Sequence, residues 1–213
     1  HISWIDSEEI ERKGAKKILS DADAIIAPGG FGKHGTLGIV EAIRYARENK
    51  IPFLGICLGM QLSLIEIARN VLKLKGADST ELIPDTPYPV IDIMQDNKGV
   101  GELGDTLRLG SYPCVLDKNS KIYKLYRKTE VAERHRNRYE ENNDYREAFE
   151  KKGVVFSGLS PDGKMVEMIE LKDHPFFVGV QGHPEYKSRP NNPHPLFRGF
   201  IEAGISHAKK HKK

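Results

Sequence analysis

The sequence predicts an α/β fold in which a doubly wound, mostly parallel central sheet is accompanied by a small antiparallel subsheet. Two observations support this prediction. In the first half, short apolar runs that are typical of buried strands alternate with segments of helical periodicity, and short links join them, as in parallel crossover connections. In the second half, apolar runs follow one another, and Gly and Pro turns separate several of them, as in antiparallel strands.

The first half contains two strand–helix pairs. Residues 23–28 and 51–56 are short apolar runs, and apolar residues recur at helical spacing after each of them, over 36–49 and 64–71. Residues 2–5 have the pattern of a strand that has already begun. We therefore expect the chain to start inside a longer polypeptide.

The second half is expected to contain a series of strands and two helices. The strands are expected at 90–94, 106–109, 154–157, 165–169 and 176–180, and the helices at 143–152 and 195–209. Residues 95–104 are polar and rich in glycine with few apolar anchors, so we expect a mobile loop there.

The composition is that of a water-soluble globular chain. Its 213 residues are 38% apolar and 30% charged, and no apolar run is long enough to cross a membrane. No signal peptide is visible, and two cysteines cannot form a disulfide framework, so we expect a cytoplasmic protein. The formal net charge of +3 includes four lysines in the tail 207–213, without which it is −1. The charge therefore favours neither nucleic acid nor a membrane as a partner.

A cysteine lies between two glycines where the second strand passes into its helix. In Gly55-Ile-Cys57-Leu-Gly59 the glycines permit a sharp, strained turn that presents the central side chain, which is the nucleophile-elbow pattern with Cys in place of Ser. The start of a helix also favours the thiolate. A lone cysteine would more often be a small buried apolar residue, but this pattern predicts a nucleophile.

A thiolate nucleophile requires a base and a group that orients the base. His183 and Glu185 follow the last predicted strand, and residues two apart in an extended segment point the same way. We expect His183 to move protons to and from Cys57 and Glu185 to orient the imidazole. Alone, a His beside a Pro is more often a turn residue; together with the cysteine pattern it is expected to complete a Cys-His-Glu triad.

Acyl chemistry also requires an oxyanion hole. The N–H group of Leu58, directly after the nucleophile, is one expected donor. The glycine-rich run 28–32 follows another strand, and its backbone can approach a ligand closely, so Gly30 N–H is the second expected donor. A phosphate-binding loop is the alternative interpretation of this run, but the Gly-Lys-Ser/Thr ending of such loops is missing.

These residues together resemble a known family. The run 55–61 (Gly-Ile-Cys-Leu-Gly-Met-Gln), with His183-Pro-Glu185 downstream and Pro28-Gly-Gly30 upstream, is similar to the class I (triad) glutamine amidotransferases, whose fold is of the flavodoxin-like type. Further runs resemble the glutaminase domain of the CTP synthase branch, and they cover almost the whole chain: 5–8, 45–48, 108–110, 112–114, 133–136, 138–140, 157–158, 160–162, 174–175, 187–190 and 195–197.

The resemblance implies that L-glutamine is hydrolysed through a thioester on Cys57 to glutamate and ammonia. An N-terminal synthetase domain of the same polypeptide would use the ammonia for ATP-dependent amination of UTP to CTP in pyrimidine biosynthesis. The resemblance also implies that this domain holds no cofactor or metal, whereas the synthetase domain binds ATP and Mg²⁺. It further implies that GTP is an allosteric activator and that the full enzyme is a homotetramer. Residues 1–213 would then be a glutaminase domain without its first strand and helix, and without the synthetase domain.

The resemblance also implies a set of glutamine-binding residues. Positions that match the family are Gly30, Leu58, Gly59, Met60, Gln61, Glu81 and Arg138. Glu81 can meet the α-ammonium group of glutamine, and a polar cluster that includes Arg138 can meet its α-carboxylate. Without the resemblance, Glu81 and Arg138 would be interpreted as surface charges.

Four positions depart from the family pattern. His34 and Leu37 stand where the family usually has Arg and Glu, Asn137 replaces a His, and Gly182 replaces a Phe. Because the triad is intact, we expect these changes to concern GTP activation, docking on the synthetase domain or the ammonia route. The run 95–104 falls where the family has a lid that GTP is thought to order.

Two other functions remain open on the sequence. A stand-alone γ-glutamyl hydrolase would use the same triad, although the branch-specific runs speak against it. A pseudo-glutaminase that serves as a docking or regulatory module would be expected to lack a triad residue, and none is missing.

Overall fold

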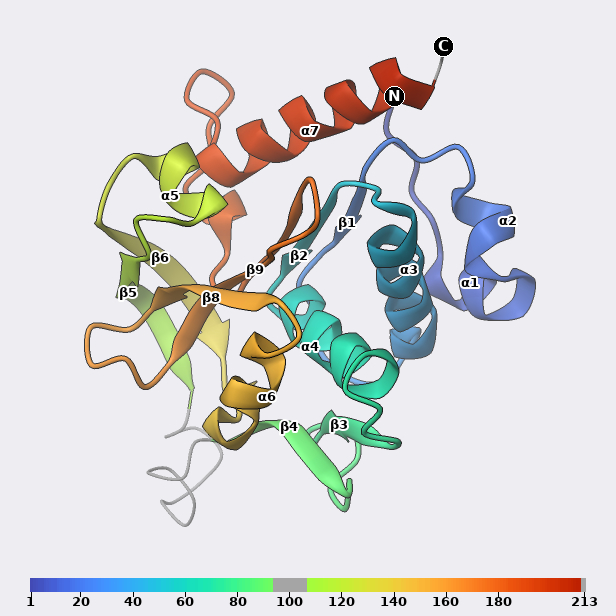
Figure 1. The fold of residues 1–213 in the computed structure, drawn as a ribbon. Helices are drawn as coiled ribbons and strands as arrows, with labels where there is room; N and C mark the ends of the chain where they lie inside the picture. Colours follow the sequence, from blue (N-terminus) through green and yellow to red (C-terminus); the bar gives the residue numbers. More distant parts are fainter. Residues whose placement is uncertain (94–106, 212–213) are drawn as a thin grey trace.

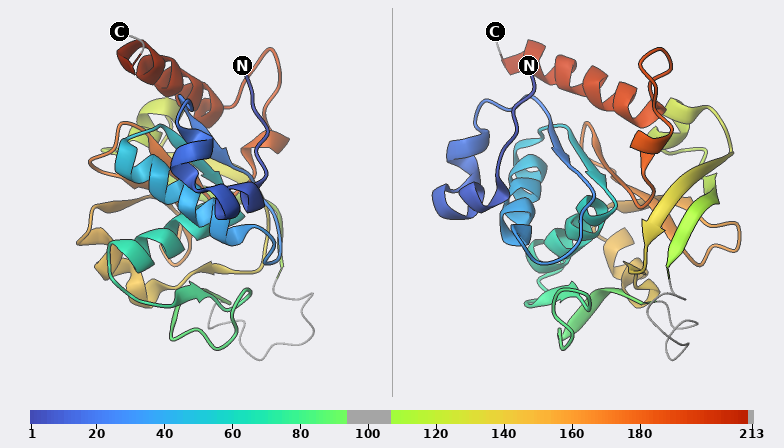
Figure 2. Two further views of the ribbon diagram at one scale, coloured as in Figure 1. Left: turned by 90° about the vertical axis from the view of Figure 1, so that its right-hand side faces the viewer. Right: turned by 180° about the vertical axis from the view of Figure 1, so that it is seen from behind.

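The computed structural model describes residues 1–93 and 107–211, and it confirms the predicted α/β fold (Figure 1). A seven-stranded sheet has helices on both faces (Figure 2). Its strands, in spatial order, are β1 (Ile25–Ala27), β2 (Phe53–Ile56), β10 (Phe177–Val180), β9 (Val166–Leu171), β8 (Val154–Leu159), β5 (Arg108–Leu116) and β6 (Glu130–Asn137).

The sheet has a parallel part and an antiparallel part. Strands β1, β2 and β10 are parallel to one another, whereas β10–β9, β9–β8, β8–β5 and β5–β6 are antiparallel pairs. The antiparallel part is therefore larger than the predicted subsheet. Short connections cause this, because links such as 160–165 and 172–176 are too short for the crossover that a parallel neighbour requires.

Two helices pack on one face of the parallel strands and a third on the other. The predicted helix 36–49 is confirmed as α3 (Thr36–Asn49), and α4 (Leu58–Asn70) begins six residues before the periodic segment 64–71, with residues 58–68 all buried. Phe53 and Phe177, with ring centroids 4.7 Å apart, face α3 and α4, while Leu54 and Val178 face α7 (Pro195–His211). This alternation is the period of two expected for strands that are covered on both faces.

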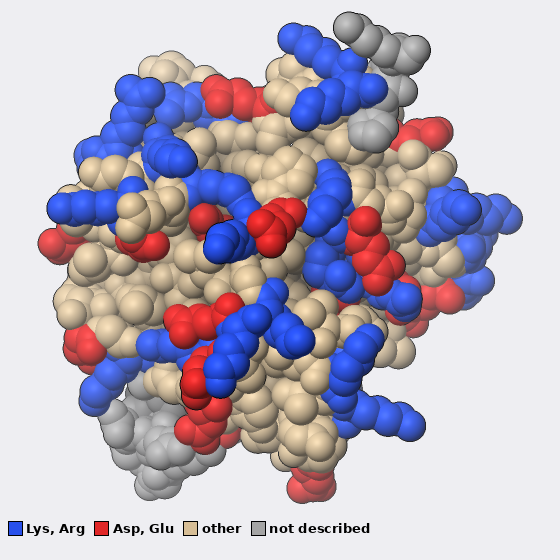
Figure 3. Space-filling model, viewed as in Figure 1, with Lys and Arg blue, Asp and Glu red and all other residues tan. Residues whose placement is uncertain are grey.

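The remaining helices are short. They are α1 (Ser7–Lys13), α2 (Ala15–Leu19), α5 (Lys121–Tyr126) and α6 (Arg146–Glu150). None of the described helices is long and apolar enough to cross a membrane. On the face shown in Figure 3, acidic and basic side chains lie interspersed rather than separated into regions of one sign.

The expected strand at 2–5 is wrong. Residues 1–6 have no regular secondary structure, and the chain first becomes regular in α1, where the Asp6 side chain accepts a hydrogen bond from Glu8 N–H. Ile2 and Trp4 are 81% and 93% exposed. Among the described residues no strand pairs with this segment, so its apolar alternation has nothing to pack against.

A second, three-stranded sheet lies beside α4. It consists of β3 (Ala77–Ser79), β4 (Tyr88–Asp92) and β7 (Glu140–Glu141), with β3 parallel and β7 antiparallel to β4. The predicted loop 95–104 and the adjoining ends of the expected strands 90–94 and 106–109 lie outside the described residues.

Glu141 of β7 is a buried carboxyl group. In the part of the chain that the structure describes, neither of its oxygens has a hydrogen-bond partner, and Nη2 of Arg146 lies 3.9 Å from Oε2. Burial raises the pKa of Glu141 to about 7, although the charge of Arg146 opposes the shift. Because the pKa is higher in the folded chain than the ordinary 4.5, the folded state loses stability as the pH rises from about 4.5 through 7.

We expect Glu141→Gln to remove this pH dependence and to raise the free energy of unfolding at pH 8 by about 3 kcal/mol, the value that corresponds to a pKa of about 7 instead of 4.5. Urea unfolding at pH 5 and pH 8 measures the effect. Glu130→Gln, at an exposed position of β6, should leave the wild-type profile unchanged. A Glu141→Gln variant with the same pH profile as the wild type would contradict the assignment.

Candidate active site

Cys57 occupies a strained turn between β2 and α4. Its backbone has φ 50° and ψ −105°, which is a left-handed value of φ for a residue with a side chain. The flanking positions must be glycine because a side chain would clash there. A Cβ at Gly55 would lie 2.6 Å from Gly59 O, and one at Gly59 would lie 2.3 Å from Ala27 O. The chain therefore forms the nucleophile-elbow geometry that the glycine spacing predicted.

Cys57 is only 3% exposed, and burial raises the pKa of its thiol to about 12. The backbone N–H of Leu58 opposes this shift, whereas the charges of Glu140, Glu185 and Glu81 add to it. The start of α4 was expected to favour the thiolate, but burial outweighs that effect. Consequently the thiol needs a nearby group that takes its proton.

His183 and Glu185 lie directly after β10, in a turn that contains the 3₁₀ helix Pro184–Tyr186. His183 Nδ1 is 2.6 Å from Glu185 Oε1, and His183 N–H donates to the carbonyl of Arg134. Since the carboxylate accepts from Nδ1, the neutral ring leaves Nε2 without a proton. Nε2 is buried and has no hydrogen-bond partner among the described residues. It is thus free to accept a proton.

The carboxyl of Glu185 remains ionised beside this ring. Burial is the largest single influence and disfavours its charge, but the hydrogen bonds from His183 and from the backbone, together with smaller electrostatic effects, hold the pKa of Glu185 below its usual range. On the other side, the ring of Tyr186 stacks on the imidazole at a centroid distance of 5.1 Å. The imidazole of His183 is therefore held both by its partner acid and by an aromatic face.

Gly29 brings the cysteine and the histidine together. A Cβ at Gly29 would lie 2.9 Å from His183 Cε1 and 3.5 Å from Cys57 Cβ, so both side chains lie against this glycine. The next residue, Gly30, lies against Leu58, because a Cβ there would be 3.3 Å from Leu58 Cδ2. The sequence singled out Gly30 but not Gly29, although both belong to the same Gly-Gly pair.

The two charged residues expected to bind glutamine lie near this group. Burial raises the pKa of Glu81, while the N–H of Gly32 and the charge of Arg138 oppose the shift. The Glu81 charge in turn acts on Cys57. Nε of Arg138 is buried without a hydrogen-bond partner in the described part of the chain. The fold thus brings Glu81 and Arg138, which are far apart in the sequence, to the same side of the site.

The other expected glutamine-binding residues belong to the first turn of α4. Met60 has no exposure and would contact a Cβ at Gly179, so its side chain belongs to the core. Gln61 is buried, and its Nε2 donates to the carbonyl of Tyr139 at 2.9 Å and to Oε1 of Gln181 at 3.2 Å. The side chain of Met60 is therefore not available to a ligand, and the side-chain nitrogen of Gln61 is engaged within the protein.

Sequence reasoning missed Gln181. Its side chain has no exposure, and Nε2 lies 3.6 Å from Sγ of Cys57. Its position two residues before His183 was the only available signal, and glutamine carries no charge or periodicity that would have marked it.

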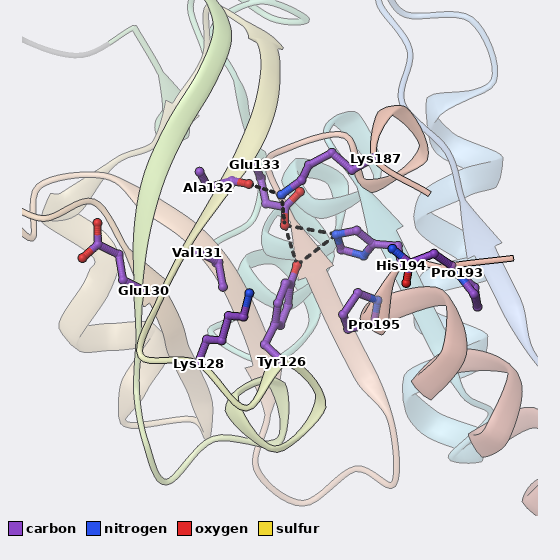
Figure 4. A pocket seen from close by; sticks show the side chains of 11 residues that line it. Tyr126, Lys128, Glu130, Val131, Ala132, Glu133, Lys187, Pro193, His194 and Pro195 are labelled. Carbon is purple, nitrogen blue, oxygen red and sulfur yellow. Dashed lines mark hydrogen bonds and ion pairs between the residues drawn. The ribbon is translucent and has the colours of Figure 1, made fainter. Parts of the chain in front are cut away.

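A polar cluster holds the segment 187–194, which follows His183 and Glu185, against β6 (Figure 4). Glu133 of β6 is 1% exposed, and its Oε1 accepts hydrogen bonds from Tyr126 Oη at 2.9 Å and from His194 Nε2 at 3.0 Å. Burial favours a raised pKa for Glu133, but the hydrogen bond from His194, together with the charge of Lys187, lowers it. Lys187 donates to the carbonyl of Ala132. The cluster lines a cavity of about 580 Å³ and ties both ends of 187–194 to β6.

The four departures from the family pattern lie in different environments. His34 and Leu37 are exposed. Asn137 is buried at the end of β6 and donates to Glu140 Oε1 at 2.7 Å. At Gly182 a Cβ would lie 2.8 Å from Glu133 Cβ, so a Phe at this position would fit only if β6 shifts.

Comparisons with known proteins agree with this geometry. The model of the family "Glutamine amidotransferase class-I" matches residues 1–203. The CTP synthase of Caldanaerobacter subterraneus subsp. tengcongensis is 57% identical over 97% of the chain, and that of Bacillus subtilis is 56% identical over 97%. The chain spans only 38% and 39% of the length of these two relatives.

A solved structure agrees as well. The glutaminase domain of Trypanosoma brucei CTPS with bound acivicin is 36% identical, with a TM-score of 0.91 over 97% of this chain and 81% of that one. The chain therefore belongs to the class I glutamine amidotransferase family, in the branch of the CTP synthase glutaminase domains.

Proposed function

We propose that this chain is the glutaminase part of a CTP synthase and that it hydrolyses L-glutamine to glutamate and ammonia. The observation that carries the proposal is the arrangement around Gly29: a cysteine on a strained turn and a histidine with a free, buried Nε2 lie against the same glycine. Glu185 holds the other nitrogen of that ring. This arrangement supports nucleophilic catalysis by the thiol of Cys57.

In the proposed reaction, His183 Nε2 takes the proton of Cys57, and the sulfur attacks the side-chain amide carbon of glutamine. The proton then passes from His183 to the amide nitrogen, the C–N bond breaks, and ammonia leaves a γ-glutamyl thioester. Water, deprotonated by His183, attacks the thioester, releases glutamate and restores the thiol. The N–H groups of Gly30 and Leu58 would stabilise the oxyanion of each tetrahedral intermediate.

The amino-acid end of glutamine would be held by charged groups beside the thiol. Glu81 would accept from the α-ammonium group, and the unpartnered Arg138 Nε would serve the α-carboxylate. Gly59, Met60 and Gln61 would border the substrate through their backbone. Among the described residues no three His, Cys, Asp or Glu side chains are grouped to hold a metal ion. The proposed steps are written without a metal ion.

The relatives support a proposal for the fate of the ammonia. Because the chain spans 38% of their length, we propose that an N-terminal synthetase domain of a longer polypeptide uses the ammonia to convert UTP to CTP with ATP and Mg²⁺. GTP activation, a homotetrameric full enzyme and a cytoplasmic location belong to the same proposal. A separate γ-glutamyl hydrolase or a non-catalytic docking module is less well supported, since the similar proteins are CTP synthases and the triad residues are all present.

Covalent labelling tests the proposal. The chain is incubated with a glutamine-mimicking electrophile, with and without excess glutamine, and the adduct is located by mass spectrometry. Ammonia and glutamate release is measured in parallel. A single adduct on Cys57 that glutamine suppresses is the expected result. Equal labelling of Cys114, or labelling of Cys57 that glutamine does not suppress, would contradict a glutamine site.

Arg138→Ala is expected to raise the glutamine concentration needed for half-maximal hydrolysis by roughly 10- to 100-fold with a smaller change in kcat, because a charge-assisted contact to the α-carboxylate is lost. Steady-state ammonia release measures both constants. Arg198→Ala, at an exposed position of α7, is the matched control and should change neither. An unchanged KM in Arg138→Ala would exclude this residue from the glutamine site.

A further inference from the structure

We propose that Gln181 is a further catalytic residue, whose side-chain amide donates a hydrogen bond to the sulfur of Cys57 and stabilises the thiolate. In the same proposal, Gln61 is the positioning residue that orients this amide. The inference rests on the proposed cysteine chemistry. Its basis is the 3.6 Å distance from Gln181 Nε2 to Sγ, a normal length for a hydrogen bond to sulfur, in a place that solvent does not reach.

The neighbouring groups determine which end of the amide faces the sulfur. The carbonyl of Tyr139 can only accept, so the Gln61 atom that lies 2.9 Å from it must be the nitrogen. This nitrogen also lies 3.2 Å from the side-chain amide of Gln181, which must therefore present its oxygen to Gln61. The nitrogen of Gln181 is then left to face Cys57. One chain of hydrogen bonds thus directs an N–H group at the sulfur.

The backbone holds Gln181 and Cys57 in fixed register. Gln181 N–H donates to the carbonyl of Glu167 in β9 at 2.8 Å. The preceding residue, Val180, accepts the N–H of Cys57 at 2.7 Å. The donor and the sulfur are therefore attached to adjacent, paired segments. Because the Gln181 side chain has no exposure, an apolar side chain of similar size in its place would leave the sulfur without this donor.

The site needs such a donor. Cys57 lies in a buried place where the charges of Glu140, Glu185 and Glu81 all disfavour a thiolate. When His183 takes the thiol proton, the negative charge remains on sulfur, and a hydrogen bond to an anion is stronger than one to the neutral thiol. Gln181 supplies no proton itself. Together with Leu58 N–H it lowers the free energy of the charged sulfur relative to the thiol.

Alkylation of Cys57 by iodoacetamide tests this directly, because its rate follows the thiolate fraction and does not require glutamine. The rate is measured from pH 6 to 10 on the full chain by mass spectrometry. Gln181→Leu removes the donor and should lower the rate at pH 8 about tenfold, with the profile displaced by about one pH unit. Gln181→Glu keeps the size and the oxygen that faces Gln61, and should lower the rate further because a carboxylate then faces the sulfur.

Gln61→Leu should also lower the rate, but Gln61→Leu combined with Gln181→Leu should be no slower than Gln181→Leu alone, since Gln61 acts through Gln181. Ser157→Ala removes a buried hydroxyl from β8, two strands away from β10, and is the matched control that should keep the wild-type profile. Circular dichroism verifies that each variant is folded.

The outcomes are distinct. A folded Gln181→Leu or Gln181→Glu variant with the wild-type pH–rate profile overturns the proposal. If Gln181→Leu does not fold, Gln181→Glu decides. Additive losses in the double variant overturn the role of Gln61. If the profile is displaced as expected but the wild type releases no ammonia from glutamine, the proposed glutaminase function fails while the role of Gln181 stands.

Discussion

Cys57→Ala is expected to lower the rate of glutamine hydrolysis by roughly 10⁴-fold or more, because the thioester cannot form without the sulfur. Glutamine should still bind, since the expected contacts of Glu81 and Arg138 with its amino-acid end do not involve the thiol. Ammonia release by the full chain gives the rate, and calorimetric titration with glutamine gives the binding. Loss of hydrolysis with retained binding would separate the nucleophile from the substrate contacts.

The second cysteine supplies the control. Cys114 in β5 has no exposure, and burial raises its pKa far above the usual range, so it is inert at neutral pH. Cys114→Ala should therefore hydrolyse glutamine at the wild-type rate. Hydrolysis that survives in Cys57→Ala would rule out Cys57 as the nucleophile. Loss of hydrolysis in Cys114→Ala would indicate that Cys114 takes part in the reaction.

His183→Asn is expected to lower hydrolysis at pH 7 by roughly 10³-fold or more, and to change the shape of the pH profile. The pKa of the buried Cys57 thiol is about 12. Without a base to take the proton, the residual rate should follow the small thiolate fraction and rise about tenfold per pH unit between pH 7 and 10. Ammonia release, or alkylation of Cys57, measures this slope.

His207→Gln is the matched control for this variant, because His207 lies on α7 and its ring interacts with Asp23, outside the group around Gly29. It should keep the wild-type profile. If His183→Asn retained the wild-type rate at pH 7, another group would have to be the base. If its residual rate did not depend on pH, the high pKa of the thiol in this site would be contradicted.

Much of the candidate site could be predicted from the sequence, because its parts are marked by local patterns. The Gly-x-Cys-x-Gly run encodes the turn through steric necessity, since no side chain fits at Gly55 or Gly59. Strands β1, β2 and β10 are parallel, so the residues that follow them meet at one edge of the sheet. The sequence predicted this parallel arrangement for β1 and β2, but it grouped 176–180 with the antiparallel runs, so the place of β10 came only from the fold. The cysteine turn and the parallel pairing of β1 with β2 thus needed only short windows of sequence.

The antiparallel half of the fold was harder to predict. Strand β6 was missed because the side chains that it buries include Glu133, His135 and Asn137, which give no apolar alternation. These groups are satisfied by partners far along the chain, such as Glu167 for His135 and His194 for Glu133. A strand that buries polar groups can be recognised only when its partners are known.

The sequence by itself determined the parallel strands β1 and β2, helix α3, the cysteine turn and the pairing of His183 with Glu185, because spacing and glycine placement act over a few residues. Tertiary structure alone decided the rest. It raised the pKa of the Cys57 thiol by burying it among carboxylates, placed Glu81 and Arg138 on the same side of the site, and directed the amide of Gln181 at the sulfur. Burial, charge and hydrogen bonding between distant segments exist only after the chain has folded, so no local pattern reports them.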